Sequence, residues 1–337
     1  MESKAAAMEE AAASDPSYPP LFRRPNPGSN READQRPAHG NPVFDVPVID
    51  LEDLDPVRLD EVCRGVGLFR IANHGVPSAL MDRLLDQSRG LLSLPFESKR
   101  TLFSDPMSYI WGTPALGAKV ANLNWVEGFH VPLGQLKSKG HDLDSQGSAS
   151  SFRCLADEYG RHMARIARTL FNVVAANLKL DAKKAASYLS EFDGTFVRVY
   201  RYPCCPEADK YFGMNAHTDS SVLSILCQDE LGGLQIFHDN QWFDVAPIPG
   251  MLTVNLGDMI QVFGNDEYRS VKHRVLTNRS KERISVCYFA FPMEDGLIIS
   301  SRYKTFTYRE WKAQVLEDIK ATGDKVGLAR FRIGDPS

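Results

Sequence analysis

The feature that most constrains the fold is a series of short apolar segments in the second half of the chain, with Gly, Pro, Asn and Asp between them. Starting at Phe196, these segments are 196–202, 222–228, 233–237, 251–256, 259–263 and 283–291. Many short strands separated by turn residues are typical of a β-sandwich or barrel. The second half is therefore predicted to fold as a closed or double-layered β structure.

Helical patterns lie on both sides of this β-rich part. One long helix is predicted by a buried stripe with steps of three to five residues, formed by Leu155, Tyr159, Met163, Ile166, Leu170, Val173 and Leu178. A shorter helix is expected from Pro77 to about Leu91. The last helix is expected to begin at Thr307, where Glu310 completes a capping-box pattern, and to end near Gly323. Together these patterns predict a mainly β protein with supporting helices, whose core is a double-stranded β-helix (a cupin-like jelly roll).

The chain is predicted to have three parts. Residues 1–44 are rich in Ala, Pro, Glu, Asn and Arg without a hydrophobic period, which is typical of a disordered tail. Residues 45–190 form an N-terminal helical and strand region, with strands at 46–51 and 68–72 and a surface loop at 134–151. Residues 191–337 form the jelly-roll core and the C-terminal helix.

Composition excludes several classes of partner. The net charge is −4, with acidic and basic residues mixed, so neither a nucleic-acid surface nor a polybasic membrane patch is expected. No apolar run approaches the roughly 20 residues that span a bilayer, and the first residues lack the pattern of a secretory signal. The six cysteines form no CxxC pair, which favours reduced thiols. We therefore expect a cytoplasmic or nuclear protein that binds neither nucleic acid nor a membrane.

A candidate metal site begins at His217 and Asp219. On a strand, the period of two would bring both side chains to one face. His273, on a later strand-like segment, is the candidate third ligand. Two imidazoles and one carboxylate can hold a divalent metal on one face and leave the remaining positions open for substrate and oxygen. A lone HxD pair also arises by chance, so this interpretation depends on the remaining motifs.

Arg283 and Ser285 form a second pair with a spacing of two. A guanidinium and a hydroxyl on one face of a strand make a receptor for a carboxylate, with charge-assisted contacts of about 1.5–3 kcal/mol each. An isolated RxS more often carries a surface arginine. Here, however, the pair begins the apolar run 284–289, which is expected to be buried.

These motifs occur in an order that resembles the plant 2-oxoglutarate and iron(II)-dependent dioxygenase family. The resemblance runs from about residue 45 to the end of the chain, and its other motifs are Val46–Leu51, Gly67–Gly75, Arg201–Pro206, Gly232–Gln235 and Val254–Asp258. It implies iron(II) bound by His217, Asp219 and His273, and O₂ as the oxidant, with ascorbate as a supporting reductant. It also implies 2-oxoglutarate as co-substrate, held by Arg283 and Ser285 with help from the Tyr202 hydroxyl. One position departs from the family pattern, because Tyr200 replaces the usual Asn two residues before that tyrosine.

Within the family, the segment Trp125–Leu133 looks like the WxExFHxPL motif of gibberellin 2-oxidases that act on twenty-carbon gibberellins. The ending Thr322–Leu328 also looks like that subgroup. The resemblance implies 2β-hydroxylation, which inactivates the hormone precursor. Tyr109, Trp125 and Phe129 are candidate walls of an apolar substrate pocket, although each could equally be ordinary core.

Two alternatives remain open. The same chemistry could act on another plant metabolite, such as an auxin or a phenylpropanoid. A metal-free jelly-roll binding protein is the alternative of another class, and the combination of the triad with RxS argues against it.

Overall fold

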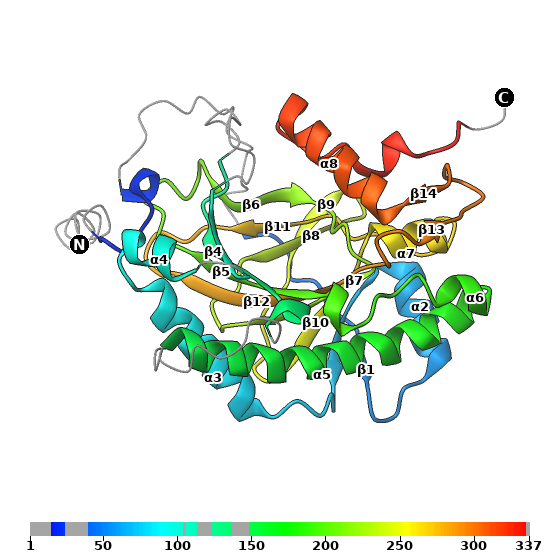
Figure 1. Ribbon diagram of the computed structural model, residues 1–337, viewed down its shortest axis with the longest axis horizontal. Coiled ribbons are helices and arrows are strands. Elements are labelled where there is room, and N and C mark those ends of the chain that lie inside the picture. Colours follow the sequence, from blue (N-terminus) through cyan, green and yellow to red (C-terminus); the bar gives the residue numbers. More distant parts are fainter. Residues whose placement is uncertain (1–14, 24–39, 104–105, 113–122, 137–147, 335–337) are drawn as a thin grey trace.

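The computed structural model describes residues 15–23, 40–103, 106–112, 123–136 and 148–334. Its centre is a pair of facing β-sheets (Figure 1). The larger sheet runs, in spatial order, through β1 (Val48–Asp50), β2 (Leu68–Ala72), β10 (Leu252–Leu256), β7 (Leu223–Gln228), β12 (Arg283–Ala290), β5 (Phe196–Tyr202), β4 (Glu127–Pro132) and β3 (Ser108–Trp111). The smaller sheet runs through β6 (Phe212–His217), β11 (His273–Leu276), β8 (Leu234–His238) and β9 (Gln241–Asp244). Two opposed, mostly antiparallel sheets confirm the predicted jelly roll.

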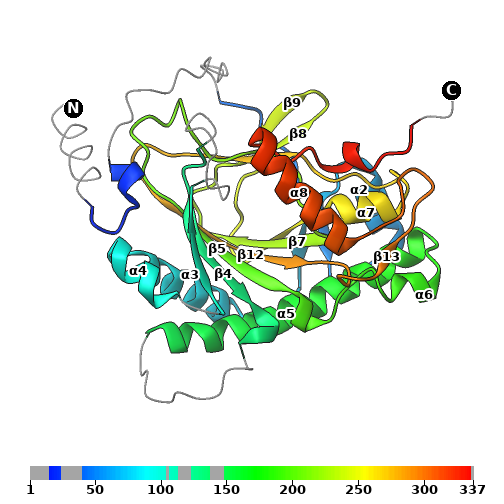
Figure 2. The same cartoon turned by 45° about the horizontal axis from the view of Figure 1, so that its top comes forward.

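Helices cover the outside of this core. They are α2 (Pro56–Gly65), α3 (Ser78–Leu92), α4 (Phe96–Leu102), α5 (Ser148–Asn177), α6 (Ala182–Ala185), α7 (Asp258–Phe263) and α8 (Tyr308–Thr322). Short 3-10 turns are η1 (Pro20–Arg23), η3 (Leu133–Gln135), η4 (Phe192–Gly194) and η5 (Gly327–Arg330), and β13 (Leu297–Ile298) pairs with β14 (Phe306–Thr307). The two views show α3 and α5 along the outer face of the larger sheet, whereas α8 crosses the opposite side of the molecule (Figures 1 and 2). No helix among the described residues is both long and apolar enough to cross a membrane.

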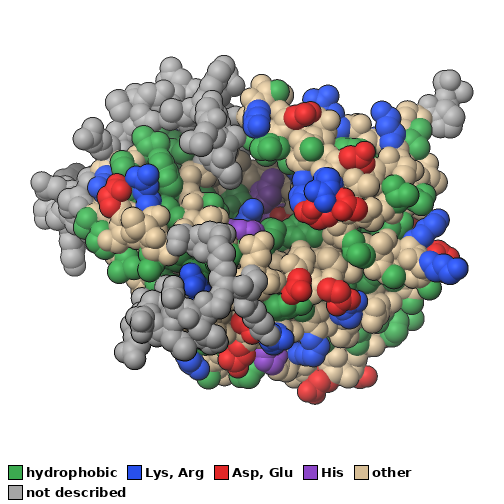
Figure 3. Space-filling model, viewed as in Figure 1, with side chains coloured by type: hydrophobic (Ala, Val, Ile, Leu, Met, Phe, Trp, Pro, Cys, Tyr) green, Lys and Arg blue, Asp and Glu red, His purple; other side chains and the backbone are tan. Residues whose placement is uncertain are grey.

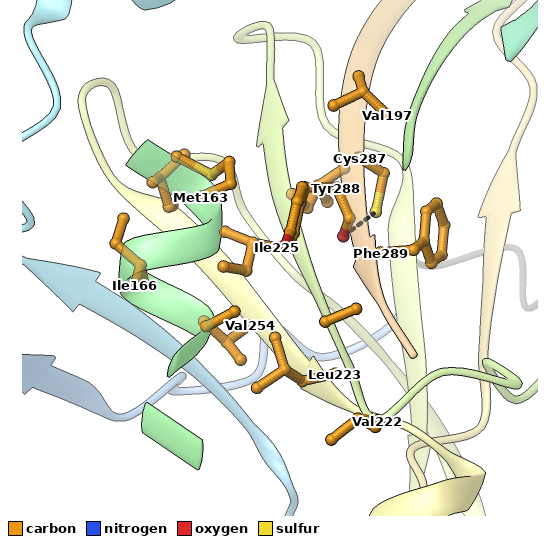
Figure 4. Close-up of a cluster of buried hydrophobic side chains, with 14 of the residues drawn as sticks. Met163, Ile166, Val197, Val222, Leu223, Ile225, Val254, Cys287, Tyr288 and Phe289 are labelled. Carbon is orange, nitrogen blue, oxygen red and sulfur yellow. Dashed lines mark hydrogen bonds between the residues drawn. The ribbon is translucent and has the colours of Figure 1, made fainter. Parts of the chain in front are cut away.

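Alternation along β12 divides the core into two layers. Tyr288 points with Ile225 toward Met163 and Ile166 of α5, whereas Phe289 points to the other side of the strand (Figure 4). Each fully buried side chain of this kind contributes about 1.5–3 kcal/mol. The apolar layer between β12 and α5 stabilises the fold. The opposite face of β12 lines the space between the two sheets.

Most of the predicted elements are confirmed. Five of the short apolar segments are strands, and α8 has the capping box between Thr307 and Glu310, with Gly323 in the left-handed conformation at its end. The strand expected at 259–263 is wrong, because this run lies in α7, with Asp258 in its first turn. A short buried apolar run does not distinguish strand from helix, whereas an acidic residue in the first turn favours a helix.

Residues 15–23 differ from the disordered tail expected for 1–44. Tyr18 and Phe22 are buried, and the backbone carbonyl of Pro16 accepts a hydrogen bond of 2.9 Å from the N–H of Phe96. Two buried aromatic side chains and this hydrogen bond dock the short segment on the folded part. Residues 1–14 and 24–39 of that predicted tail, and residues 137–147 of the predicted loop at 134–151, lie outside the described part; α5 begins at Ser148.

Candidate active site

The two candidate histidines come from adjacent strands of the smaller sheet. His217 ends β6 and pairs directly with His273, the first residue of β11. Their ring centroids are 4.2 Å apart. Neighbours in an antiparallel pair project to the same face, so both imidazoles point into the space between the sheets.

Asp219 reaches the same point from a loop. The HxD spacing predicts one strand that carries both His217 and Asp219, but β6 ends at His217 and Asp219 lies beyond it. Its Oδ1 is 3.7 Å from Nε2 of His217 and 3.8 Å from Nε2 of His273. One ligand atom from each residue lies within 4.8 Å of the others, so a single cation could sit within about 2.5 Å of all three, close to ordinary metal–ligand distances.

Neighbouring groups orient all three side chains. Nδ1 of His217 lies 2.7 Å from the carbonyl of Asn215, and Nδ1 of His273 lies 2.9 Å from the carbonyl of Val271. These contacts favour the proton on Nδ1 and leave the lone pair of Nε2 for a metal. The Ser224 hydroxyl donates to Oδ2 of Asp219 at 2.6 Å.

Protonation states in the cluster suit a cation. Burial, followed by the neighbouring His273, lowers the pKa of His217 to about 3, so its imidazole is neutral at physiological pH. Burial raises the pKa of Asp219, but the adjacent imidazoles and the Ser224 hydroxyl bring it below its usual value. Two imidazoles, of which that of His217 is neutral, and one carboxylate match the donor set that binds iron(II) with open positions.

Arg283 and Ser285 lie deeper between the sheets, on β12. Arg283 donates from Nη1 to the Ser285 hydroxyl at 3.1 Å and from Nη2 to Oε1 of Gln228 at 2.7 Å. Among the described residues, its Nε has no hydrogen-bond partner and no carboxylate pairs with its guanidinium. A buried cation without an anion costs stability unless a ligand supplies one. The pair therefore fits a carboxylate ligand.

Tyr202 lies against this receptor from the neighbouring strand. It pairs with Arg283 across β5 and β12, and the guanidinium carbon stacks 4.9 Å from the centre of its ring. A Cβ on Gly213 would approach Cδ1 of Tyr202 to 2.5 Å, so this ring needs a glycine beside it. Burial raises the pKa of Tyr202, which keeps the phenol protonated and able to donate a hydrogen bond.

A cavity of about 1060 Å³ joins these groups. The surface is hollowed near the middle of one face, where histidine side chains are visible inside (Figure 3). Its lining includes all six residues singled out above: Tyr202, His217, Asp219, His273, Arg283 and Ser285. Beyond them the wall is largely apolar, with aromatic side chains from β5 and β12 and one side of α8. This combination of an apolar wall and a few polar groups is typical of small-molecule sites.

The three aromatic residues predicted to wall the pocket lie elsewhere. Phe129 stacks on Phe103 in the outer core, with ring centroids 4.4 Å apart, and Trp125 packs 4.5 Å from Phe22. Tyr109 turns its hydroxyl to Glu127. None of Tyr109, Trp125 and Phe129 lines the cavity. The sequence did not reveal which face of β3 and β4 is inward.

Arg198 and Tyr200 also line the cavity, although no motif in the sequence indicated them as site residues. They precede Tyr202 on β5 with a spacing of two, and all three line the cavity. Burial raises the pKa of Tyr200, the departure from the family pattern, and the neighbouring Arg198 partly offsets this rise. The guanidinium also packs over the ring of Phe196 at 4.9 Å, and no carboxylate among the described residues pairs with it. The period of two that identified Tyr202 could have identified both residues.

Glu127, the acidic residue of the WxExFHxPL segment, joins a buried ion cluster. It pairs with Lys99 and Arg201, and all three side chains are at most 1% exposed. The backbone carbonyl of Ser17 accepts from Lys99 at 2.6 Å and from Arg201 at 3.2 Å. Burial, partly offset by Glu127, lowers the pKa of Lys99 to about 8. This glutamate therefore holds the N-terminal segment, β4 and β5 together.

We expect Glu127→Gln to destabilise the protein by about 3 kcal/mol, because it leaves the buried Lys99 without its anion and Arg201 with only Glu282, at 3.5 Å. Urea unfolding of the parent and the variant measures the difference. Glu97→Gln is the matched control, since Glu97 pairs with Arg100 with 76% of its side chain exposed and should change stability by less than about 1 kcal/mol. Equal stability of the Glu127 variant and the parent would contradict this role.

Comparisons with known proteins agree with the geometry. Residues 192–292 match the model of the 2OG-Fe(II) oxygenase superfamily, and residues 46–146 match the N-terminal model of non-haem dioxygenases described for morphine synthesis. Gibberellin 2-beta-dioxygenase 6 of Oryza sativa subsp. japonica is 38% identical over 307 residues, which cover 85% of each chain.

Two solved structures share the fold of this chain. The crystal structure of JOX2 in complex with 2OG, Fe and JA aligns with a TM-score of 0.73 and 29% identity, covering 88% of this chain and 92% of that one. The rice dioxygenase for auxin oxidation aligns with a TM-score of 0.69 and 25% identity, covering 86% of this chain and all of the other.

Proposed function

Because this chain belongs to the 2OG-Fe(II) oxygenase superfamily, we propose that it is a gibberellin 2-oxidase that hydroxylates twenty-carbon gibberellins at the 2β position and so inactivates them. The observation that carries this proposal is the 38% identity to a rice gibberellin 2-beta-dioxygenase over 85% of both chains. A large, mostly apolar cavity beside the histidine and aspartate cluster supports it.

His217, Asp219 and His273 are the proposed iron(II) ligands, and Arg283, Ser285 and Tyr202 the proposed receptor for the distal carboxylate of 2-oxoglutarate. Bound iron(II), with 2-oxoglutarate and O₂, supplies the oxidising power that breaks a C–H bond, while the co-substrate becomes succinate and CO₂. The protein orients the co-substrate through Arg283, keeps the imidazole of His217 neutral, and surrounds the reacting carbon with apolar walls that limit access of water.

Arg198 is the proposed contact for the carboxylate of the substrate. It lies on the same face of β5 as Tyr202, four residue pairs along the strands from Arg283, and has no anionic partner among the described residues. Phe196 and Phe289 flank its guanidinium at 4.9 and 5.9 Å. An acid with a bulky hydrocarbon skeleton matches one cation set in aromatic walls.

We expect Arg198→Gln to raise the KM for the gibberellin about 10- to 100-fold, because a charge-assisted contact of about 1.5–3 kcal/mol is lost. The 2-oxoglutarate requirement should stay the same, since Arg283 is retained. Steady-state kinetics with each substrate varied in turn gives both values. Arg168→Gln, at an exposed pair with Glu191, is the control. An unchanged gibberellin KM in the Arg198 variant would count against this contact.

Product analysis tests the substrate. Purified enzyme is incubated with iron(II), ascorbate, 2-oxoglutarate and twenty-carbon gibberellins, and hydroxylated products are identified by mass spectrometry. Auxin is the second candidate, because the rice auxin-oxidising dioxygenase shares the fold and Arg198 could also pair with its carboxylate. Turnover of auxin without any gibberellin product would refute the first proposal. Absence of an iron(II)–2-oxoglutarate absorption band without oxygen would favour a non-catalytic binding protein.

A further inference from the structure

Lys325 lies in the C-terminal segment, whose Thr322–Leu328 motif has no role in the function proposed above. Gly323 ends α8 in the left-handed conformation, and the lysine then turns back into the protein, with only 15% of its side chain exposed. Its Nζ donates to the carbonyl of Thr218 at 2.6 Å, to Oδ2 of Asp258 at 2.6 Å and to the Ser220 hydroxyl at 3.2 Å. An ammonium group has three protons, and here each has an acceptor.

These acceptors surround a single residue, Asp219. Thr218 and Ser220 are its neighbours in the chain, and the backbone N–H of Asp258 donates to the carbonyl of Asp219 at 2.8 Å. Because β6 ends at His217, no strand pairing holds Asp219 in position. The start of α7 also packs closely against the loop that carries Asp219. A Cβ on Gly257, the residue before α7, would lie 2.1 Å from the carbonyl oxygen of Ser221, so this close packing requires glycine.

We infer that Lys325 is a positioning residue for the metal centre, because it ties the loop that carries Asp219 to Asp258 and to the C-terminal segment. A ligand must be held to within about 0.5 Å of its working geometry, and a loop residue needs outside support to meet that demand. The C-terminal segment that contains Lys325 also lines the cavity next to α8. Lys325 therefore connects this part of the cavity wall to the loop that carries Asp219. The inference rests on the proposed role of Asp219 but not on the identity of the substrate.

Metal titration without oxygen tests this role. The apoprotein is titrated with Co(II), whose visible absorption reports binding, and the Kd is compared among variants. We expect Lys325→Met to raise the Kd about 10- to 100-fold, as is usual when a group that orients a metal ligand is lost. Lys320→Met is the matched control, because Lys320 lies on the exposed side of α8 and should leave the Kd unchanged.

A double variant separates positioning from simple charge pairing. Lys325→Met alone leaves the buried Asp258 without its cation, which lowers the thermal stability of the apoprotein. Asp258→Asn combined with Lys325→Met removes both charges and should recover much of that stability, while the Kd stays raised. A parent-like Kd in the double variant would overturn the inference, since Lys325 would then serve only as the partner of Asp258. Neither result depends on gibberellin turnover, so failure of the proposed function would be seen separately.

Discussion

Replacing His217 by alanine is expected to abolish turnover, because the metal would lose one of only three proposed protein ligands. Nε2 of His217 and Nε2 of His273 lie 3.7 and 3.8 Å from Oδ1 of Asp219. In the described part of the chain, no other group of three His, Cys, Asp or Glu residues is close enough together to hold an ion. Loss of a group that merely orients a ligand already costs about 10- to 100-fold in metal affinity or activity. Removal of a ligand should therefore lower metal affinity and activity by more than about 100-fold.

Succinate formation and Co(II) affinity, measured on the same preparation, check this result. His238→Ala is the control, because His238 ends β8 with 33% of its side chain exposed and does not line the cavity. The control should keep full turnover. Metal-dependent turnover near the parent rate in the His217 variant would show that the ligands lie elsewhere.

Arg283→Ala is expected to raise the 2-oxoglutarate requirement roughly 100-fold or more. The arginine is 3% exposed and has no carboxylate partner among the described residues, so its loss would leave the bound co-substrate with an unpaired buried carboxylate. Breaking a buried pair in this way costs about 3–5 kcal/mol, and each 1.4 kcal/mol is a factor of ten. Metal affinity without co-substrate should change little, since Arg283 does not contact the histidines.

The apparent KM for 2-oxoglutarate is the quantity to measure. Arg279→Ala is the matched control, because Arg279 pairs with Asp209 at the surface with 60% of its side chain exposed. Unchanged co-substrate affinity in the Arg283 variant would contradict the assigned receptor. A Lys substitution at the same position should restore only part of the affinity, because it supplies charge without the two-pronged geometry of arginine.

The sequence predicted those parts of the site that depend on strand periodicity. Arg283 and Ser285 lie on one face of β12 as their spacing required, and His273 lies on a strand. Asp219 converges with the histidines for another reason: it is held by a loop whose contacts come from α7 and Lys325, which are distant in sequence. Local pattern carries no information about such contacts.

The same limit explains the pocket residues. A run of alternating side chains on β4 does not reveal which face meets the cavity, and Phe129 turned out to face the outer core. The run 259–263 illustrates a different ambiguity, because a short buried helix and a short buried strand are equally apolar. Arg198 could have been found from periodicity, but only the three-dimensional structure shows that no carboxylate of the described residues pairs with it.

The docked residues 15–23 affect more than stability. Phe22 meets Trp111 edge-on at 6.1 Å, and Trp111 belongs to the cavity lining. Both family matches begin after this segment. The matched regions therefore leave out Phe22, which packs against Trp111 in the cavity wall. We therefore expect that substrate preference is not transferred with the catalytic core alone. A chimera that received only residues 46–292 would gain the catalytic residues, but the segment that packs behind Trp111 would still be that of the recipient protein.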